Sequence, residues 1–236
     1  MVVLYILLGL AIALSILFIV FQRPKYPFIS LALKGLASLA VVATAFSGFA
    51  IASDGGGGLL AFTLLCIGLA ACMLGDVFLA QLEFDNARLT DRIRAFGFLA
   101  FSIAQLCFIA FFASLLGIYA LYALIAGAVL AVAVYFIGKL MKLQFGKLTW
   151  VVLVYSFLVG TALGGAIVYL ILAPAELIIW LLAIGLVLFL ISDLVLSSIY
   201  FGAQPANRKL YYVNYAFYYA AIICISSIFV FGIGLS

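Results

Sequence analysis

The chain has 236 residues, of which 70% are hydrophobic and only 8% are charged, and its formal net charge is +4. This composition, with a mean hydropathy of +1.48, excludes a soluble globular domain and predicts an all-α polytopic membrane protein. Because the sequence contains no histidine, His-ligated metal sites and His-based catalytic triads are excluded as well.

Eight apolar stretches follow one another along the chain, each close to the roughly 20 residues that a membrane-spanning helix needs. The shortest break between two of them is LGIY (116–119), which contains almost nothing polar. These stretches leave no room for a soluble domain, so we expect a single integral membrane domain over residues 1–236. The expected transmembrane helices cover roughly residues 2–21, 28–52, 59–82, 95–116, 118–139, 148–173, 176–200 and 211–235.

The basic residues predict the orientation of these spans. All of them except Lys34 lie in the connections after the first, third, fifth and seventh spans. By the positive-inside rule these four connections are cytoplasmic and both termini lie outside. The positive net charge therefore reflects topology and does not indicate a nucleic-acid partner. The short loops fit a protein of the bacterial inner membrane, which is the location we expect, and an organelle membrane is the alternative. The sequence does not indicate an oligomeric state.

Two aspartates interrupt the apolar spans. Asp76 lies in ACMLGDVFLA (71–80) and Asp193 in LFLISDLVLS (188–197), each about 10 Å inside the expected cytoplasmic end of its helix. A charged side chain at the centre of a bilayer costs about 2.5–3.5 kcal/mol on insertion scales, so an acid inside a span indicates a functional site. Two acids in matching contexts predict one shared site.

The segments around the two aspartates also resemble each other. CIGLAACMLGDVFLAQLEF (66–84) aligns without a gap on AIGLVLFLISDLVLSSIYF (183–201), with Ile, Gly, Leu, Asp, Leu and Phe in common. Asp193 follows Asp76 by 117 residues, and this offset superimposes the first four spans on the last four. It predicts a 4+4 parallel internal repeat with halves 1–117 and 118–236. Symmetry would then bring one aspartate from each half near a common axis.

Other polar side chains fall at the same expected depth in the cytoplasmic leaflet. Each has a structural alternative: Lys34 could extend to the headgroups, Gln105 could join helices, Tyr155 could be packing, and the tyrosines of the last span could form an interfacial belt. As groups that bind or support a substrate we select Lys34, Gln105, Tyr155, Ser192, Asn214, Tyr215 and Tyr218. The four cysteines lie within spans without paired spacing and are expected to be apolar packing residues, so we expect no metal or cofactor.

Two carboxyl groups in a poorly hydrated site do not both ionise readily, so one tends to hold a proton while the other stays charged. This division supplies a general acid and a general base. Such a pair can protonate an enol ether and direct water to the resulting cation, as glycosidases do with an oxocarbenium ion. The membrane location favours a lipid-like substrate. The sequence does not distinguish which aspartate is the acid.

The segments LGDVFL (74–79) and GLVLFLISD (185–193), with a lysine near the start of the second span, resemble the YhhN-like, or lysoplasmalogenase, family of membrane proteins. The resemblance runs through all eight spans and implies hydrolysis of the vinyl-ether bond of lysoplasmalogens, giving a fatty aldehyde and a glycerophospho-base. It also implies that Asp76 and Asp193 are the acidic pair and that Lys34 is the family's lysine.

The chain departs from the family pattern at several positions. Gln105 stands where the family usually has histidine, and Phe108 replaces a nearby tyrosine. Gly35 stands where a proline commonly follows the lysine, and NYAFYYA (214–220) diverges in the last span. These departures leave the acid pair intact and leave open which headgroup and chain the substrate carries.

Two other functions fit the same residues. A proton-coupled transporter or lipid exporter would also use buried acids and parallel repeats, although the prolines that would interrupt its spans all lie at or outside span ends. A lipid-binding protein without catalytic activity would need the acids for stability alone. We expect the hydrolase, with a lysolipid as its partner.

Overall fold

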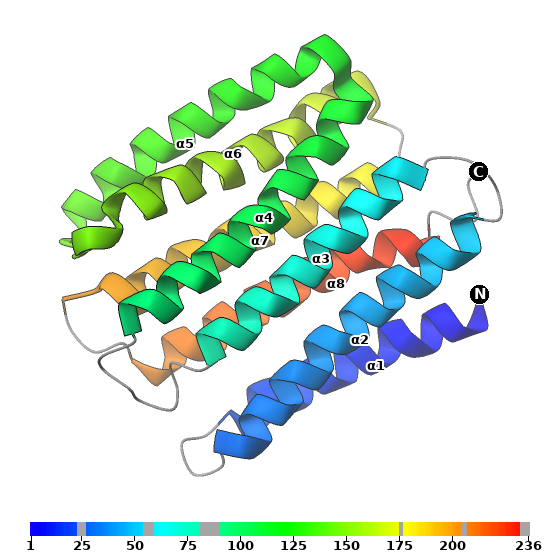
Figure 1. The fold of residues 1–236 in the computed structure, drawn as a ribbon, viewed down its shortest axis with the longest axis horizontal. Helices are drawn as coiled ribbons and strands as arrows, with labels where there is room; N and C mark the ends of the chain where they lie inside the picture. The colour runs from blue at the N-terminus through cyan, green and yellow to red at the C-terminus, as the bar shows by residue number, and fades with distance from the viewer. Residues whose placement is uncertain (23–26, 54–58, 81–89, 175–176, 204–206, 232–236) are drawn as a thin grey trace. The chain divides into compact units, whose positions relative to one another are not determined.

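The computed structural model describes residues 1–22, 27–53, 59–80, 90–174, 177–203 and 207–231, and these residues are predominantly helical (Figure 1). Two short 3-10 turns, η2 (Gly117–Tyr119) and η3 (Gly146–Leu148), precede α5 and α6. The α-helices are α1 (Val2–Phe21), α2 (Pro27–Ser53), α3 (Leu59–Ala80), α4 (Thr90–Leu116), α5 (Ala120–Leu140), α6 (Thr149–Leu172), α7 (Leu177–Phe201) and α8 (Arg208–Phe231).

Seven stretches of the described chain are helical, long and apolar enough to cross a membrane. The count is seven because Arg92–Leu140, which contains α4 from Arg92 onward together with η2 and α5, is one continuous apolar stretch of 49 residues. Many large apolar side chains are exposed, such as Ile6 at 62%, Leu121 at 56% and Ile171 at 74%. A soluble protein would not leave so much apolar surface in water, so the helices confirm the polytopic membrane class. The expectation of eight separate crossings stays a prediction.

The helix bounds follow the expected spans to within a few residues, with two exceptions. Helix α4 begins at Thr90, about a turn before the expected start, and α8 begins at Arg208. Basic residues at these ends are therefore part of the helices, because a helix can continue past the apolar core into the headgroup region. Residues 232–235 of the last expected span lie outside the described residues.

The LGIY break is a real helix end. Helix α4 ends at Leu116, and Gly117 has a φ of +54°, in the left-handed region that glycine enters without a steric penalty. The turn η2 follows directly, and the backbone N–H of Ala120 donates to the carbonyls of Gly117 and Ile118 as α5 begins. Glycine is therefore the residue that ends α4 in an otherwise continuous apolar sequence.

Contacts divide the chain into two compact units. The first unit contains residues Met1–Phe111 with Ile222–Ser236, and the second contains Phe112–Ala221. The boundaries fall within α4 and α8, so each of these helices contributes one part to each unit. These units differ from the halves 1–117 and 118–236 that the repeat predicts, because the end of α8 belongs to the first unit. The duplication itself stays a prediction.

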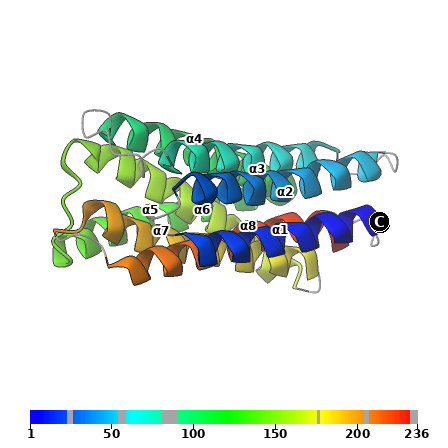
Figure 2. The ribbon, with the colours of Figure 1, turned by 90° about the horizontal axis from the view of Figure 1, so that it is seen from below.

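In the first unit, α1 packs on α2 and α2 packs on α3. Figures 1 and 2 show α2, α3 and α4 one beside the next, in the order of the chain. The end of α8 joins this unit, because Phe229 covers Gly48 of α2: a Cβ atom at Gly48 would lie 2.9 Å from the backbone oxygen of Phe229. Gly48 thus allows α2 and α8 to approach at backbone distance.

In the second unit, α5 packs on α6 and α6 on α7. The α5–α6 contact is especially close, because Cβ atoms at Gly160 and Gly164 would lie 3.0 Å from the Cα of Gly127 and 3.0 Å from the carbonyl oxygen of Ala123. Small residues spaced one turn apart let helix backbones approach without a hydrophobic driving force, as is typical inside membranes.

One contact of the first unit recurs in the second at positions 117 residues apart. Phe229 covers Gly48, and Phe112 covers Gly165. Gly165 follows Gly48 by 117 residues, and Phe229 follows Phe112 by the same offset. The fourth helix of each sequence half therefore packs on the second helix of the other half, at equivalent positions. The pairs α1–α2 and α2–α3 likewise correspond to α5–α6 and α6–α7.

Candidate functional site

Asp76 lies near the end of α3 within a buried polar cluster of the first unit. Its side chain is buried, and the Lys34 Nζ lies 3.8 Å from Asp76 Oδ1. The hydroxyl of Ser38 donates a 2.6 Å hydrogen bond to the other carboxyl oxygen, Oδ2. Both partners come from α2, and both are buried. A cation and a hydroxyl donor together stabilise a negative charge on Asp76 that would otherwise be costly in this apolar setting.

The spacing of α2 explains why it supplies both partners. Lys34 and Ser38 are four residues apart, so they lie one above the other on one face of the helix. Ser30 lies one turn earlier on the same face and is also buried. These three residues form a buried polar face of α2, and α2 packs against α3. The structure therefore favours the pairing of Lys34 with Asp76 over an extension of its side chain to the membrane surface.

Small residues on α3 bring α4 close to the region of Asp76. The ring of Phe101 covers Gly75, where a Cβ atom would lie 2.6 Å from it, and the ring of Phe108 covers Gly68 at the same distance. Because these two positions lack a Cβ atom, α4 can approach α3 closely beside Asp76. Gln105 lies between these two phenylalanines on the same face of α4, and it is completely buried.

Asp193 lies in α7 and has a different partner. The phenol hydroxyl of Tyr155, on α6, donates a 2.8 Å hydrogen bond to Asp193 Oδ2. The Tyr155 side chain is buried, whereas Asp193 is partly buried. A neutral phenol thus occupies in the second unit the place that Ser38 occupies in the first. Tyr155 is consequently not simple packing, because its hydroxyl holds the carboxyl group of Asp193.

The next residue, Ser192, bonds to α8 rather than to the acid beside it. The Asn214 amide Nδ2 donates to the Ser192 carbonyl at 2.8 Å and to its Oγ at 2.9 Å, and the Ser192 hydroxyl reaches the Asn214 carbonyl at 3.3 Å. Both residues are buried. These bonds fix α8 against α7 next to Asp193, so the two residues support the position of that helix.

The tyrosines of α8 are interior side chains. Tyr215 and Tyr218 are buried at 8% and 5% exposure, which argues against an interfacial belt for these two. The Tyr218 ring lies edge-on against Phe189 of α7 and against Tyr219, with centroids 5.7 and 5.3 Å apart. Tyr218 therefore contacts α7 one turn before Asp193.

Sequence reasoning missed Ser38. It found Lys34 and both aspartates because charges are conspicuous in apolar spans, whereas a serine is common there. The repeat offset carries the signal that would have found it. Ser38 lies 117 residues before Tyr155, and both hydrogen bonds to the aspartates cross 38 residues of sequence.

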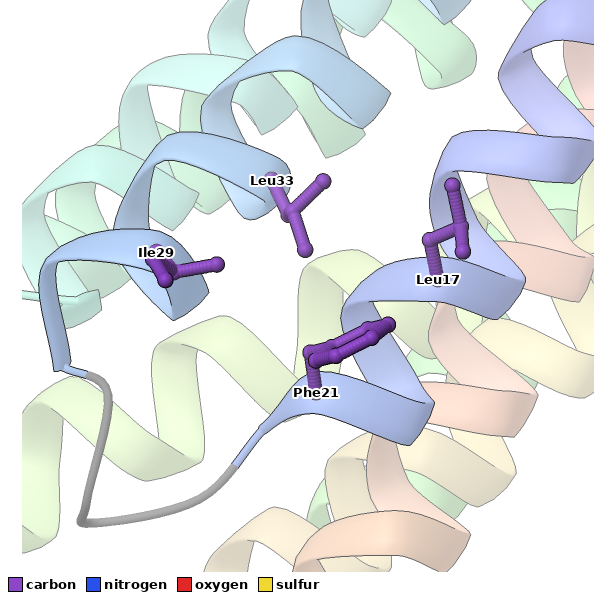
Figure 3. Close-up of a pocket in the computed structure, with 4 residues that line it drawn as sticks. All are labelled: Leu17, Phe21, Ile29 and Leu33. Atoms are coloured by element: carbon purple, nitrogen blue, oxygen red, sulfur yellow. The ribbon is translucent and has the colours of Figure 1, made fainter.

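An apolar groove of about 260 Å³ lies between α1 and α2 in the first unit, as Figure 3 shows. The side chains of Leu17 and Phe21 on α1 and of Ile29 and Leu33 on α2 line it, and they converge from the two helices. Among the described residues, no group of three or more His, Cys, Asp or Glu side chains gathers to hold a metal ion.

Comparison with known proteins gives one result. No curated protein sequence and no solved structure matches this chain. A sequence model of the YhhN family does match, over residues 29–228, which include both aspartates, their hydroxyl partners and Lys34. Since the match covers most of the sequence, the chain belongs to the YhhN family.

Proposed function

We propose that this protein is an intramembrane hydrolase that cleaves the vinyl-ether bond of lysoplasmalogen-type lysolipids. The observation that carries the proposal is the pair of membrane-embedded carboxyl groups, each held by a hydroxyl donor on the neighbouring helix. Membership of the YhhN family supports it, because the resemblance of the sequence to this family implies that reaction. The products are a fatty aldehyde and a glycerophospho-base.

The chemistry needs one proton donor and one proton acceptor. A carboxylic acid protonates the alkenyl carbon that is not attached to oxygen, which leaves an oxocarbenium ion at the neighbouring carbon. A carboxylate takes a proton from water as the water oxygen bonds to that carbon, giving a hemiacetal. The hemiacetal then breaks its bond to the glycerol oxygen, which leaves as an alcohol while the aldehyde forms. In this collapse the protonated base donates its proton to the leaving glycerol oxygen, and the deprotonated acid accepts the proton of the hemiacetal hydroxyl, so both carboxyl groups return to their starting states.

The environments of the two acids divide these roles. Lys34 provides a positive charge beside Asp76, which suits Asp76 to act as the carboxylate that activates water. Asp193 is held by the neutral phenol of Tyr155, which suits it to carry the proton that is transferred to the alkenyl carbon. The position equivalent to Lys34 in the second half is Val151, so the cation belongs to one half alone.

Release of fatty aldehyde from an alkenyl lysolipid by the purified protein tests the proposal. We expect turnover by the wild type and a loss of at least about a hundredfold in D76N and in D193N, the usual scale for removing a general acid or base. S102A is a matched control, because within the described residues the Ser102 hydroxyl donates to the Phe98 carbonyl, one turn earlier in its own helix. Wild-type protein that releases no aldehyde, under conditions in which a verified relative does, refutes the hydrolase.

The proposal requires both carboxyl groups to act on one substrate. Residues that act as a unit give losses that do not add, so D76N/D193N should be about as slow as the slower single variant. If the losses multiply, the two acids serve independent events and this mechanism is wrong. Proton-dependent flux of lysolipid into proteoliposomes without aldehyde release would favour the transporter instead.

We also propose that all eight helices cross the membrane, with the basic connections in the cytoplasm and both termini outside, in a bacterial inner membrane. Support comes from the break at Gly117 and from the recurrence of the Gly48–Phe229 contact as Gly165–Phe112, which a 4+4 parallel duplication explains. Labelling of single introduced cysteines from each side of the membrane tests this: K142C should react with an impermeant reagent from the cytoplasmic side only.

A further inference from the structure

Gln105 is a buried amide that the fold leaves without hydrogen bonds. Its side chain is 0% exposed, and neither Oε1 nor Nε2 has a hydrogen-bond partner among the described residues. A buried donor or acceptor without a partner is strongly unfavourable, and such groups are rare in folded proteins. An amide with two such groups, a donor and an acceptor, indicates that a bound molecule supplies their hydrogen bonds.

The packing of α4 on α3 locates this amide relative to the acid. Gly97 meets Leu79, Phe101 meets Gly75 and Phe108 meets Gly68, which together define one antiparallel register. In this register Gln105 falls opposite Ala71, a little more than one turn from Asp76, or about 7.5 Å along the helix axis.

The fold itself does not need an amide here. The residue 117 positions after Gln105 is Ile222, which is 2% exposed in α8. Under the proposed duplication, the equivalent position of the other half is thus filled by an apolar side chain. Gln105 therefore places a polar group, at a cost in stability, where the repeat shows that a hydrocarbon side chain fits.

We propose that Gln105 is a substrate-binding residue that takes the free hydroxyl group of the lysolipid glycerol. A hydroxyl both donates and accepts, and it matches an amide that presents Nε2–H and Oε1 side by side. In a lysolipid this hydroxyl lies on the carbon next to the one bearing the ether oxygen, so Asp76 and Gln105 would hold neighbouring groups of one molecule. The inference rests on the proposed function for the identity of the lipid.

The test measures binding apart from turnover. Detergent-solubilised wild type and Q105M are each titrated with a saturated ether lysolipid, which has no vinyl-ether bond to cleave, and with its analogue that lacks the free hydroxyl. Thermal unfolding reports binding. We expect the wild type to bind the hydroxyl lipid about tenfold more tightly than the deoxy lipid, and Q105M to bind both equally. S102A should behave as the wild type.

Turnover of the alkenyl lysolipid supplies the second readout. Loss of the hydroxyl contact predicts a KM raised about tenfold in Q105M. A water molecule is the other source of the same chemistry: it would give a wild type that does not discriminate the two lipids and a Q105M with lowered kcat, and that result overturns the assignment to the lipid. Because Q105M removes two unpartnered groups, it should unfold at or above the wild-type temperature.

Three outcomes overturn the inference. They are equal affinities for the two lipids in the wild type, a Q105M that retains the discrimination, and a Q105M that unfolds well below the wild type, since its amide would then be satisfied within the protein. The variant Q105N, which keeps the amide on a shorter stem, should fold and retain part of the discrimination. A wild type that discriminates the lipids without releasing aldehyde would refute the proposed hydrolase while supporting the role of Gln105 in binding.

Discussion

Tyr155 donates a hydrogen bond to Asp193 over 38 residues of sequence, the same separation that joins Ser38 to Asp76. Two hydroxyl groups 117 positions apart in the chain thus hold two acids that are also 117 positions apart. If the two hydrogen bonds had arisen independently, chance would have to account both for their joining equivalent pairs of helices and for their lying at equivalent positions in those helices. What differs between the halves is the cation, because Lys34 has no basic equivalent at Val151.

Removing each hydroxyl tests how much each acid depends on it. In Y155F the Asp193 oxygen loses the donor in this bond, and we expect a loss of about 1–3 kcal/mol in the free energy of unfolding or in transition-state binding. The loss in S38A should be smaller, because the Lys34 ammonium still lies beside the Asp76 carboxylate. Chemical unfolding in detergent and aldehyde release measure the two effects. A larger loss for S38A than for Y155F would contradict this order.

The ion pair of Lys34 and Asp76 makes a second prediction. K34M leaves a buried carboxylate without its cation, and removing one member of a buried pair costs about 3–5 kcal/mol. The double variant K34M/D76N has no charge left to bury, so it should recover most of that stability. Thermal unfolding of the wild type, both single variants and the double variant measures the coupling. Additive losses would show that the pair contributes nothing to stability.

The sequence predicts the helices and the acids well, and the physical reasons are clear. A helix that spans a membrane needs about 20 predominantly apolar residues, so hydropathy determines where these helices lie to within about a turn. Buried charges are rare enough that Lys34, Asp76 and Asp193 stand out without a structure. Which of the two acids accompanies Lys34 does not follow from the sequence, and the structure pairs it with Asp76.

Hydroxyl and amide groups are harder to predict. A serine within a span can bond to its own helix, as Ser15 does with the Ala11 carbonyl, or to another helix, as Ser38 does with Asp76. Nothing in the local sequence separates these cases, because the choice depends on the rotation of the helix and its neighbours. For the same reason, the sequence could not show that Ser192 bonds to Asn214 instead of to Asp193.

Glycine substitutions provide a third prediction about packing. In G164A the added Cβ would lie 3.0 Å from the carbonyl oxygen of Ala123 and 2.6 Å from the Cβ of Ala126, and backbone atoms of α5 cannot move aside cheaply. We expect a loss of about 1–3 kcal/mol, the usual effect of overpacking. G9A is the matched control, because a Cβ at Gly9 meets nothing within 4 Å and alanine favours a helix. The free energy of unfolding of G9A should equal or exceed that of the wild type.

The end of α5 makes the fourth prediction. Leu143 N–H bonds to the Gly138 carbonyl and Lys142 N–H to the Lys139 carbonyl, a helix end that requires a left-handed residue at Lys142, whose φ is 55°. Lysine has a steric penalty there that glycine avoids, so K142G should stabilise the protein by about 1 kcal/mol.

K142A is the control, since it removes the same charge but keeps a Cβ atom. If K142A stabilises as much as K142G, the gain comes from the charge among the neighbouring lysines, and the backbone at this turn is not strained. An increase confined to K142G shows that the turn holds lysine in its left-handed conformation at the expense of stability, because only the loss of the Cβ atom then separates the two variants.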